Sequence, residues 1–265
     1  MKRRTFISRV ALGATAIAAS PLVSCSTGAK NLKISLAQWS LHRAFFEGKL
    51  DAADFAAIAM DTYGIDAIEY VNGFYMDSAR DEKFWSNMKD RAAKAGVKSL
   101  LMMVDDEGDL GAAIIDGMGR LAEYAAQSDI NIVIENHGLY SSDAQLIASI
   151  IKEVNLPNFG SFPDFGNWCL SAKWGTTQGD CDRVYDRYQG VSELLPYAKA
   201  VSAKSYNFNE QGEDTKIDYY RMLEIVKRSD YDGYIGIEYE GEVLGEHEGI
   251  LTTKALMEKA WNSIP

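Results

Sequence analysis

Short apolar segments alternate with longer amphipathic segments along the chain from Leu32 onward. The apolar segments are rich in Val, Ile and Leu, which is typical of strands buried in a sheet. Regular alternation of this kind predicts parallel βαβ units and therefore an α/β fold. The predicted strands are 32–39, 67–71, 97–104, 130–135, 159–164, 200–206 and 234–239. The predicted helices are 51–63, 81–95, 111–127, 142–154, 191–199, 218–229 and 252–261.

Polar residues stand near the carboxyl ends of most of these strands. A closed barrel gathers all its strand ends around one mouth, whereas a doubly wound sheet has one switch point, usually with a phosphate loop. Gly117 and Gly119 lie inside a predicted helix and follow no strand, so they form no such loop. The sequence therefore predicts a TIM-type (β/α) barrel. The strand-end residues are Gln38, Glu69, Glu135, Asp164, Lys204 and Glu238.

The predicted barrel is short of one βα unit. Seven strands can be identified, whereas a complete TIM barrel has about eight. Residues 105–129 hold one predicted helix and a loop, where a complete barrel would carry a further unit of roughly thirty residues. Either the barrel has seven strands or it is open at this point.

The first 25 residues have the features of a bacterial export signal. The basic residues 2–4 at the start resemble a twin-arginine signal. The apolar segment that follows them is too short to span a bilayer. Leu22-Val-Ser-Cys25 resembles a lipobox; an ordinary cleaved signal with an incidental Cys25 is the alternative. We expect 1–25 to be a signal peptide with a lipobox, 26–30 a tether and 31–265 the barrel domain. The protein would then be periplasmic or anchored to the membrane only through lipid at Cys25.

The chain is acidic, with a formal net charge of −11 at pH 7, and loss of the basic leader would make it more so. Such a surface argues against nucleic acid or an anionic membrane as a partner. Apart from Cys25, the cysteines are Cys169 and Cys181. Export would permit a disulfide between them, and two separate buried thiols are the alternative.

Three carboxylates lie at the ends of late strands. Glu135 ends one, Asp164 ends the next, and Glu238 lies near the end of the last. In a closed barrel they converge, and carboxylates in a partly dry pocket must protonate, pair with cations or bind a metal. Oxygen ligands suit hard divalent ions, so the sequence predicts a site for Mn²⁺ or Mg²⁺. Taken singly, each acid is also compatible with a surface or salt-bridged position.

Four short motifs lie near these strand ends: IENHG at 134–138, PDFGN at 163–167, AKSY at 203–206 and GIEYEG at 236–241. In order and spacing they resemble the sugar phosphate isomerase/epimerase family, which has the xylose isomerase-like TIM barrel. The resemblance implies that a Glu, an Asp, a His and a second Glu hold a divalent metal. By motif these positions are Glu135, Asp164, Ser202 in place of the histidine, and Glu238. A serine hydroxyl is a poor ligand, so the metal would be held weakly or completed by water.

The resemblance further implies proton abstraction next to a carbonyl of a sugar, with Glu135 and Glu238 as acid and base on opposite faces. This predicts a metal-dependent sugar isomerase or epimerase. Lys204 can stabilise an oxyanion or transfer a proton; a plain ion pair with a carboxylate is the alternative. We expect His137, Trp39 and Glu69 to contact the substrate, although His137 can equally be a structural histidine bonded within its loop.

Two other functions stay open. The same enediolate can expel a β-leaving group, which would make the protein a lyase acting on 3-keto-glycosides. With Ser202 and the missing unit, the chain can also be a non-catalytic barrel that binds carbohydrate. Export favours unphosphorylated sugars or glycosides as ligands, since sugar phosphates are intracellular metabolites.

Overall fold

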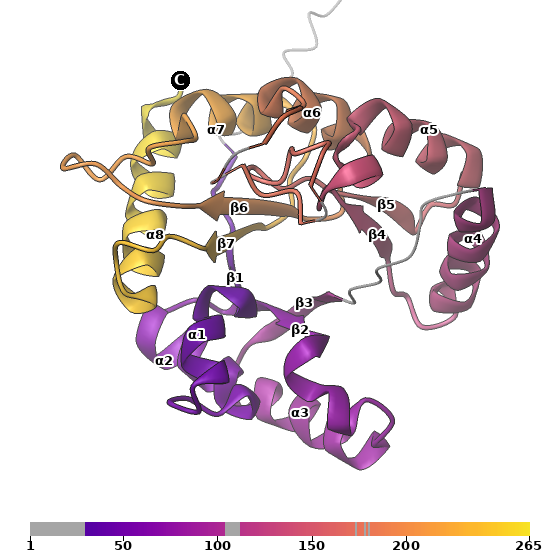
Figure 1. Ribbon diagram of the computed structural model, residues 1–265. Helices are drawn as coiled ribbons and strands as arrows, with labels where there is room; N and C mark the ends of the chain where they lie inside the picture. The colour runs from indigo at the N-terminus through magenta and orange to yellow at the C-terminus, as the bar shows by residue number, and fades with distance from the viewer. Residues whose placement is uncertain (1–29, 104–111, 173, 178, 180) are drawn as a thin grey trace, which may run out of the picture. The chain divides into compact units, whose positions relative to one another are not determined.

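Parallel strands alternate with helices throughout the domain (Figure 1). The computed structural model describes residues 30–103, 112–172, 174–177, 179 and 181–265. The predicted signal peptide with Cys25, most of the tether, and residues 104–111 lie outside them. No helix of the described part is long and apolar enough to cross a membrane. The strands of the described part are β1 (Ile34–Ala37), β2 (Ala67–Val71), β3 (Lys98–Met103), β4 (Ile132–Glu135), β5 (Phe159–Phe162), β6 (Val201–Ser205) and β7 (Ile235–Tyr239).

The strands follow one another as a barrel requires. Five of them form a sheet in the order β3-β2-β1-β7-β6, and β4 pairs with β5. All of these pairs are parallel. Parallel bridges from Ser161 to Ala198 and from Asp164 to Ser202 join the β5 segment to the β6 segment. The first and last strands are thus neighbours, which gives the predicted TIM-type barrel rather than a doubly wound sheet.

The barrel is open at one place. Within the described residues, no strand pairing links β3 to β4. This seam coincides with the stretch 105–129, where the sequence lacks one βα unit. The described part holds seven strands, as predicted, and a neighbour is missing between the third and the fourth.

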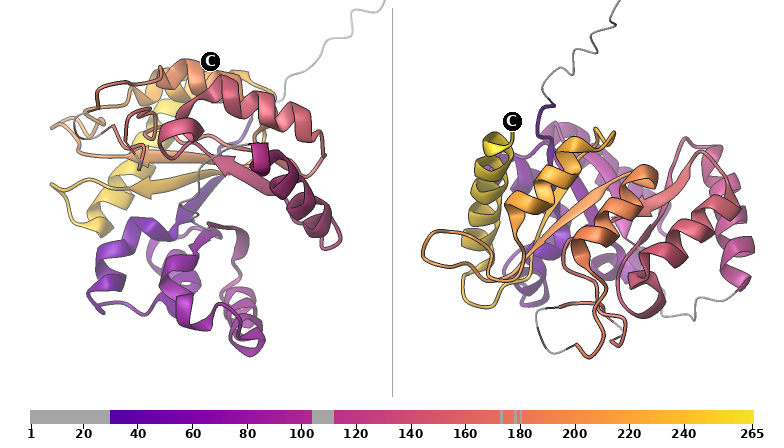
Figure 2. Two further views of the ribbon diagram at one scale, coloured as in Figure 1. Left: turned by 45° about the vertical axis from the view of Figure 1, so that its right-hand side comes forward. Right: turned by 90° about the horizontal axis from the view of Figure 1, so that it is seen from above.

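Helices lie outside the strands, as Figures 1 and 2 show from three directions. Aspartates begin several of them: the side chains of Asp81, Asp143, Asp186 and Asp218 accept hydrogen bonds from backbone N–H groups of the first turn. Such caps satisfy donors that have no partner within the helix. The helices are α1 (His42–Phe46), α2 (Phe55–Tyr63), α3 (Glu82–Ala95), α4 (Ala112–Ala126), α5 (Ala144–Val154), α6 (Arg187–Leu194), α7 (Tyr219–Arg228) and α8 (Glu246–Ser263). Short 3₁₀ segments are Gln38–Leu41, Ala52–Asp54, Asn72–Ser78, Leu139–Ser142 and Leu195–Tyr197.

Alternate residues of a strand face the helices and the barrel interior. In β7, Ile235, Ile237 and Tyr239 belong to the hydrophobic core. Glu238 lies between them in sequence and hydrogen bonds to a β6 side chain instead. This period of two places apolar residues under the helices and polar residues inside the barrel.

Two helices begin earlier than the sequence predicts. α6 starts at Arg187 rather than 191, because Asp186 caps it. α8 starts at Glu246 rather than 252, and Gly249 lies within its first turns. A Cβ at Gly249 would overlap the Tyr239 ring, so this glycine serves close packing against β7 and does not end the helix. The predicted strand 32–39 ends earlier, at Ala37, because its last two residues belong to the 3₁₀ segment Gln38–Leu41, and α1 has no counterpart among the predicted elements.

Candidate metal and substrate site

The three predicted carboxylates meet at the carboxyl ends of their strands. Glu135 is the last residue of β4, Asp164 lies two residues beyond β5, and Glu238 lies in β7. One ligand oxygen from each lies within 4.8 Å of the others. The structure thus brings together residues that lie far apart in the sequence, from position 135 to position 238.

Strand register explains why they meet. Asp164 bridges to Ser202, and Lys204 stands opposite Glu238 in the β6–β7 ladder. Because side chains alternate along a strand, Ser202 and Lys204 share the inner face of β6 and meet the inward side chain of Glu238. Asp164 and Glu238 are buried, whereas Glu135 keeps some exposure at the mouth.

Burial raises the pKa of all three carboxyl groups. The pKa of Glu135 lies well above its usual value, because the charges of Glu238 and Asp164 add to the cost of burial. Burial also raises the pKa of Asp164, and it raises that of Glu238 to about 7 although Lys204 opposes the shift. The cluster therefore retains protons near neutral pH unless a cation joins it.

Ser202 lies between two of the carboxylates. Its Oγ is 2.6 Å from Asp164 Oδ2 and 2.8 Å from Glu238 Oε2. A hydroxyl carries one proton and can donate to only one carboxylate at a time. The second contact therefore needs a proton on a carboxyl group, in keeping with the raised pKa values of Asp164 and Glu238.

Two carboxamides hold the β4–β5 side of the cluster. Asn167 Nδ2 donates to Glu135 Oε1 at 3.3 Å, and the Asn167 backbone N–H donates to Asp164 Oδ1 at 2.7 Å. The Oδ1 atom of Asn167 is buried and has no hydrogen-bond partner among the described residues. Asn136 Oδ1 accepts from the Asp164 backbone N–H at 2.7 Å. The sequence reasoning assigned neither amide a role, although each lies inside a motif beside a carboxylate.

Charge holds the β6–β7 side. Lys204 Nζ lies 3.5 Å from Glu238 Oε1 and 3.1 Å from Glu240 Oε2. Burial alone would lower the pKa of Lys204, but Glu238, Glu240 and Asp164 outweigh it and raise the pKa well above its usual value. Trp39 Nε1 donates to Glu240 Oε1 at 2.6 Å. Glu240, to which the sequence reasoning gave no role, thus links the predicted residues Lys204 and Trp39.

The other residues predicted to contact the substrate lie at different places in the barrel. His137, two residues beyond Glu135, lies edge-on to Trp174 with ring centroids 5.7 Å apart. Burial, with Lys204, lowers the pKa of His137 to about 4. Glu69 is buried inside the barrel and accepts a hydrogen bond from Ser35 Oγ at 2.7 Å. Their roles as substrate contacts stay predictions.

A model of the family described as xylose isomerase-like TIM barrel matches residues 46–260, which is more than half of the chain. This chain belongs to that family. A search of curated proteins finds no match to the sequence. The predicted fold and the coarser part of the predicted resemblance are confirmed.

Solved structures show the same fold at low identity. A xylose isomerase domain containing protein from Salmonella typhimurium LT2 is 12% identical with a TM-score of 0.57, over 85% of this chain and 97% of that one. L-ribulose 3-epimerase is 11% identical, with a TM-score of 0.57 over 88% and 96% of the two chains. D-psicose 3-epimerase, solved in the presence of D-fructose, is 11% identical with a TM-score of 0.55 over 87% and 96%. At these identities the likeness concerns the fold alone.

In this xylose isomerase-like barrel, the donor set fits a hard divalent cation. Glu135, Asp164 and Glu238 each offer a carboxylate oxygen within one small space. Ser202 adds a neutral oxygen that already touches two of them. Oxygen ligands of this kind suit Mg²⁺ or Mn²⁺, and a cation would replace the protons that burial otherwise imposes.

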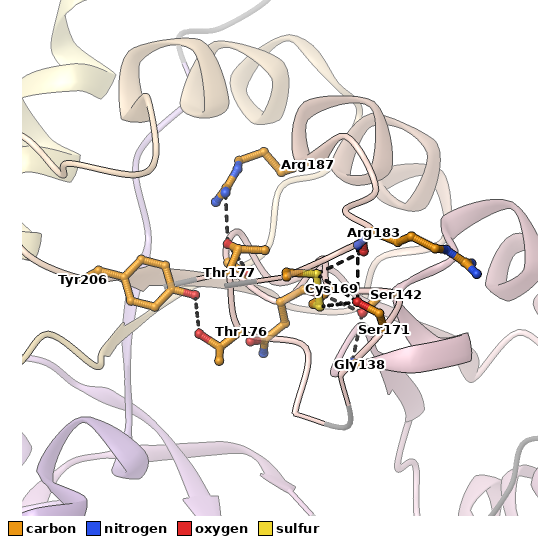
Figure 3. The surroundings of a disulfide bond; sticks show 12 residues. Gly138, Ser142, Cys169, Ser171, Thr176, Thr177, Arg183, Arg187 and Tyr206 are labelled. Carbon is orange, nitrogen blue, oxygen red and sulfur yellow. Dashed lines mark hydrogen bonds between the residues drawn. A yellow bond between two sulfur atoms is a disulfide. The ribbon is translucent and has the colours of Figure 1, made fainter. Parts of the chain in front are cut away.

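A disulfide closes the loop that follows Asn167. Cys169 and Cys181 form a disulfide, so the alternative of two separate thiols does not hold. Figure 3 shows Ser171 next to both sulfur atoms and Thr176 pointing toward Tyr206, to which its hydroxyl is bonded at 3.1 Å. The disulfide joins the segment that follows Asp164 and Asn167 to the segment that leads into α6.

Proposed function

We propose that this barrel is a divalent-metal-dependent isomerase or epimerase that abstracts a proton next to the carbonyl of an unphosphorylated sugar or glycoside. The observation that carries the proposal is the convergence of Glu135, Asp164 and Glu238 within 4.8 Å. The fold likeness to D-psicose 3-epimerase and L-ribulose 3-epimerase supports the same reaction class. Glu135, Asp164 and Glu238 would hold the ion.

The protein groups divide the work. The divalent ion that Glu135, Asp164 and Glu238 would hold would supply Lewis-acid polarisation of the sugar carbonyl. Glu135 and Glu238 approach from different strands, so one takes the proton and the other returns it on the opposite face. Lys204 remains protonated, because its pKa is raised well above the usual value, and stabilises negative charge that develops on oxygen. Asp164 is fixed by backbone N–H groups of Gly166 and Asn167 and keeps its orientation throughout.

Export of the protein belongs to the same proposal. The chain carries a disulfide, which is typical of proteins in oxidising compartments. Such a compartment supplies few sugar phosphates, so free sugars or glycosides are the expected substrates. The leader, the lipid anchor at Cys25 and the twin-arginine route are part of this proposal and require N-terminal analysis of the exported protein.

Incubation with candidate sugars in deuterated water tests the reaction. We expect deuterium to enter the carbon next to the carbonyl without fragmentation, and the Glu135→Gln, Glu238→Gln double variant to lose this exchange about 10²–10⁴-fold. Release of an aglycone would instead identify a 3-keto-glycoside lyase. Sugar affinity that is unchanged in the double variant, together with no exchange, would identify a non-catalytic binding barrel.

A further inference from the structure

We infer that Trp174 is a stacking platform for the second ring of a glycoside, so that the site takes a sugar joined to another neutral ring rather than a free monosaccharide. This inference rests on the proposed function. Trp174 is 51% exposed and contacts the imidazole edge of His137. Because His137 follows Glu135 by two residues, this contact links the indole to the chain segment that carries Glu135.

The backbone that carries Trp174 is held firmly. Leu139 N–H donates to the carbonyl oxygens of Cys169 at 3.1 Å and Ala172 at 3.2 Å. Cys169 N–H donates to Gly175 O at 2.9 Å, and the disulfide closes the loop. Gly175 has φ +65° and lies so close to the Gly138 backbone that a Cβ would overlap it. These contacts hold residues 169, 172 and 175, so the Trp174 indole would lose little entropy on binding a ring.

Two residues next to the Trp174 loop are also apolar and exposed. Leu139 is 40% exposed and Tyr140 is 56% exposed, and Leu139 is bonded directly to the Trp174 loop. Large exposed apolar side chains beside a polar site are typical of ligand-binding surfaces. A pyranose ring suits such a place, since its C–H face packs on an aromatic ring while its hydroxyls reach polar neighbours.

Charge selects a neutral second ring. Lys204, the cation that contacts the carboxylate cluster, is shared between Glu238 and Glu240. An anionic second ring would therefore find Lys204 already paired, within a chain whose net charge is −11. Trp39, which follows β1 and hydrogen bonds to Glu240, is the aromatic residue proposed to contact the first ring.

Calorimetric titration with matched sugar pairs tests the platform. The probes are D-glucose with cellobiose, D-galactose with lactose, and D-xylose with xylobiose, each in the presence of Mg²⁺. We expect at least one disaccharide to bind the wild type about 3- to 10-fold more tightly than its monosaccharide, which is the range of one aromatic contact. Trp174→Ala should bring that ratio close to one, and Trp174→Phe should restore part of it.

Tyr124→Ala is the matched control, because Tyr124 is 72% exposed on the outer helix α4. The control should keep the wild-type ratio. The inference is overturned if no disaccharide outbinds its monosaccharide, or if Trp174→Ala keeps the wild-type ratio. Persisting proton exchange with a free monosaccharide would then show that the proposed function stands without the platform. Absence of exchange with every probe would count against the proposed function itself.

Discussion

On the β6–β7 side of the carboxylate cluster, Glu238 lies 3.5 Å from the Lys204 ammonium, whereas on the β4–β5 side Glu135 accepts a hydrogen bond from the Asn167 carboxamide. The first side is held by charge, and the second by neutral amides and a disulfide. The pKa values reflect this contrast, since that of Glu238 rises only to about 7 and that of Glu135 rises well above its usual value.

The contrast indicates how the two glutamates share the work. Groups whose surroundings separate their pKa values are suited to acid and base roles at one pH. Lys204 beside Glu238 opposes the rise of that pKa, whereas Glu135 has the neutral Asn167 amide as its hydrogen-bond donor. A cation placed among Glu135, Asp164 and Glu238 would displace protons that burial retains on the cluster.

Removing the charge from the β6–β7 side should have the largest effect on stability. Lys204→Met leaves Glu238 and Glu240 buried without their cation, so we expect the free energy of unfolding to fall by about 3–5 kcal/mol. Urea denaturation of the metal-free protein measures it. Lys33→Met is the matched control, because Lys33 pairs with Asp232 at the surface and should change stability by about 0–1 kcal/mol. Equal losses of unfolding free energy in the two variants would contradict the claim that charge holds the β6–β7 side.

The disulfide should be the next largest contribution, on the opposite side. The Cys169→Ser, Cys181→Ser double variant should lose about 3 kcal/mol of unfolding free energy, the value expected for a short closed loop. The thermal midpoint of the wild type, but not of the variant, should fall when a thiol reductant is added. A wild-type thermal midpoint that does not change with the reductant would show that the disulfide contributes little to stability.

Asn167 tests whether neutral amides position the metal ligands. Asn167→Ala removes the donor to Glu135 but keeps the backbone N–H that binds Asp164. We expect affinity for Mg²⁺ or Mn²⁺ to fall about 10–100-fold, as for other outer hydrogen-bond partners of metal ligands. Asn158→Ala is a suitable control, since Asn158 bonds backbone carbonyls of Ala122 and Ile130. Unchanged metal affinity in Asn167→Ala would leave the orientation of Glu135 to other groups.

His137 gives the β4 side a pH dependence of its own. Its pKa is lowered to about 4, so between pH 4 and about 6.5 the unfolded chain binds more protons at this residue than the folded one. Stability from His137 is therefore present above pH 6.5 and is lost as the pH falls toward 4, by at most about 1.4 kcal/mol per pH unit. Unfolding free energies of wild type and His137→Asn, measured from pH 4 to 8, should diverge in this window and run parallel above it. Parallel curves throughout would place His137 in water.

Local sequence patterns predict much of the fold. The strand 67–71 was predicted with its observed bounds, because the pattern of apolar residues that defines a strand is local. The missing unit was located where the barrel is open. α8 began earlier than predicted because Gly249 packs against Tyr239, a contact that only the fold creates.

The site divides in the same way. The carboxylates Glu135, Asp164 and Glu238 were found because strand ends of a barrel must converge. Their partners Asn167 and Glu240 were given no role, because the sequence does not show in which direction the side chain of a neighbouring amide or acid points. The pairing of Cys169 with Cys181 likewise needed the loop geometry.

Titration of the metal-free protein with Mn²⁺, followed by electron paramagnetic resonance of the free ion, tests the central claim most directly. The account predicts one bound ion per wild-type chain, held by Glu135, Asp164 and Glu238, and loss of that ion in the Glu135→Gln, Glu238→Gln double variant. A wild type that binds no ion, or a double variant that binds Mn²⁺ as tightly as the wild type, would contradict it.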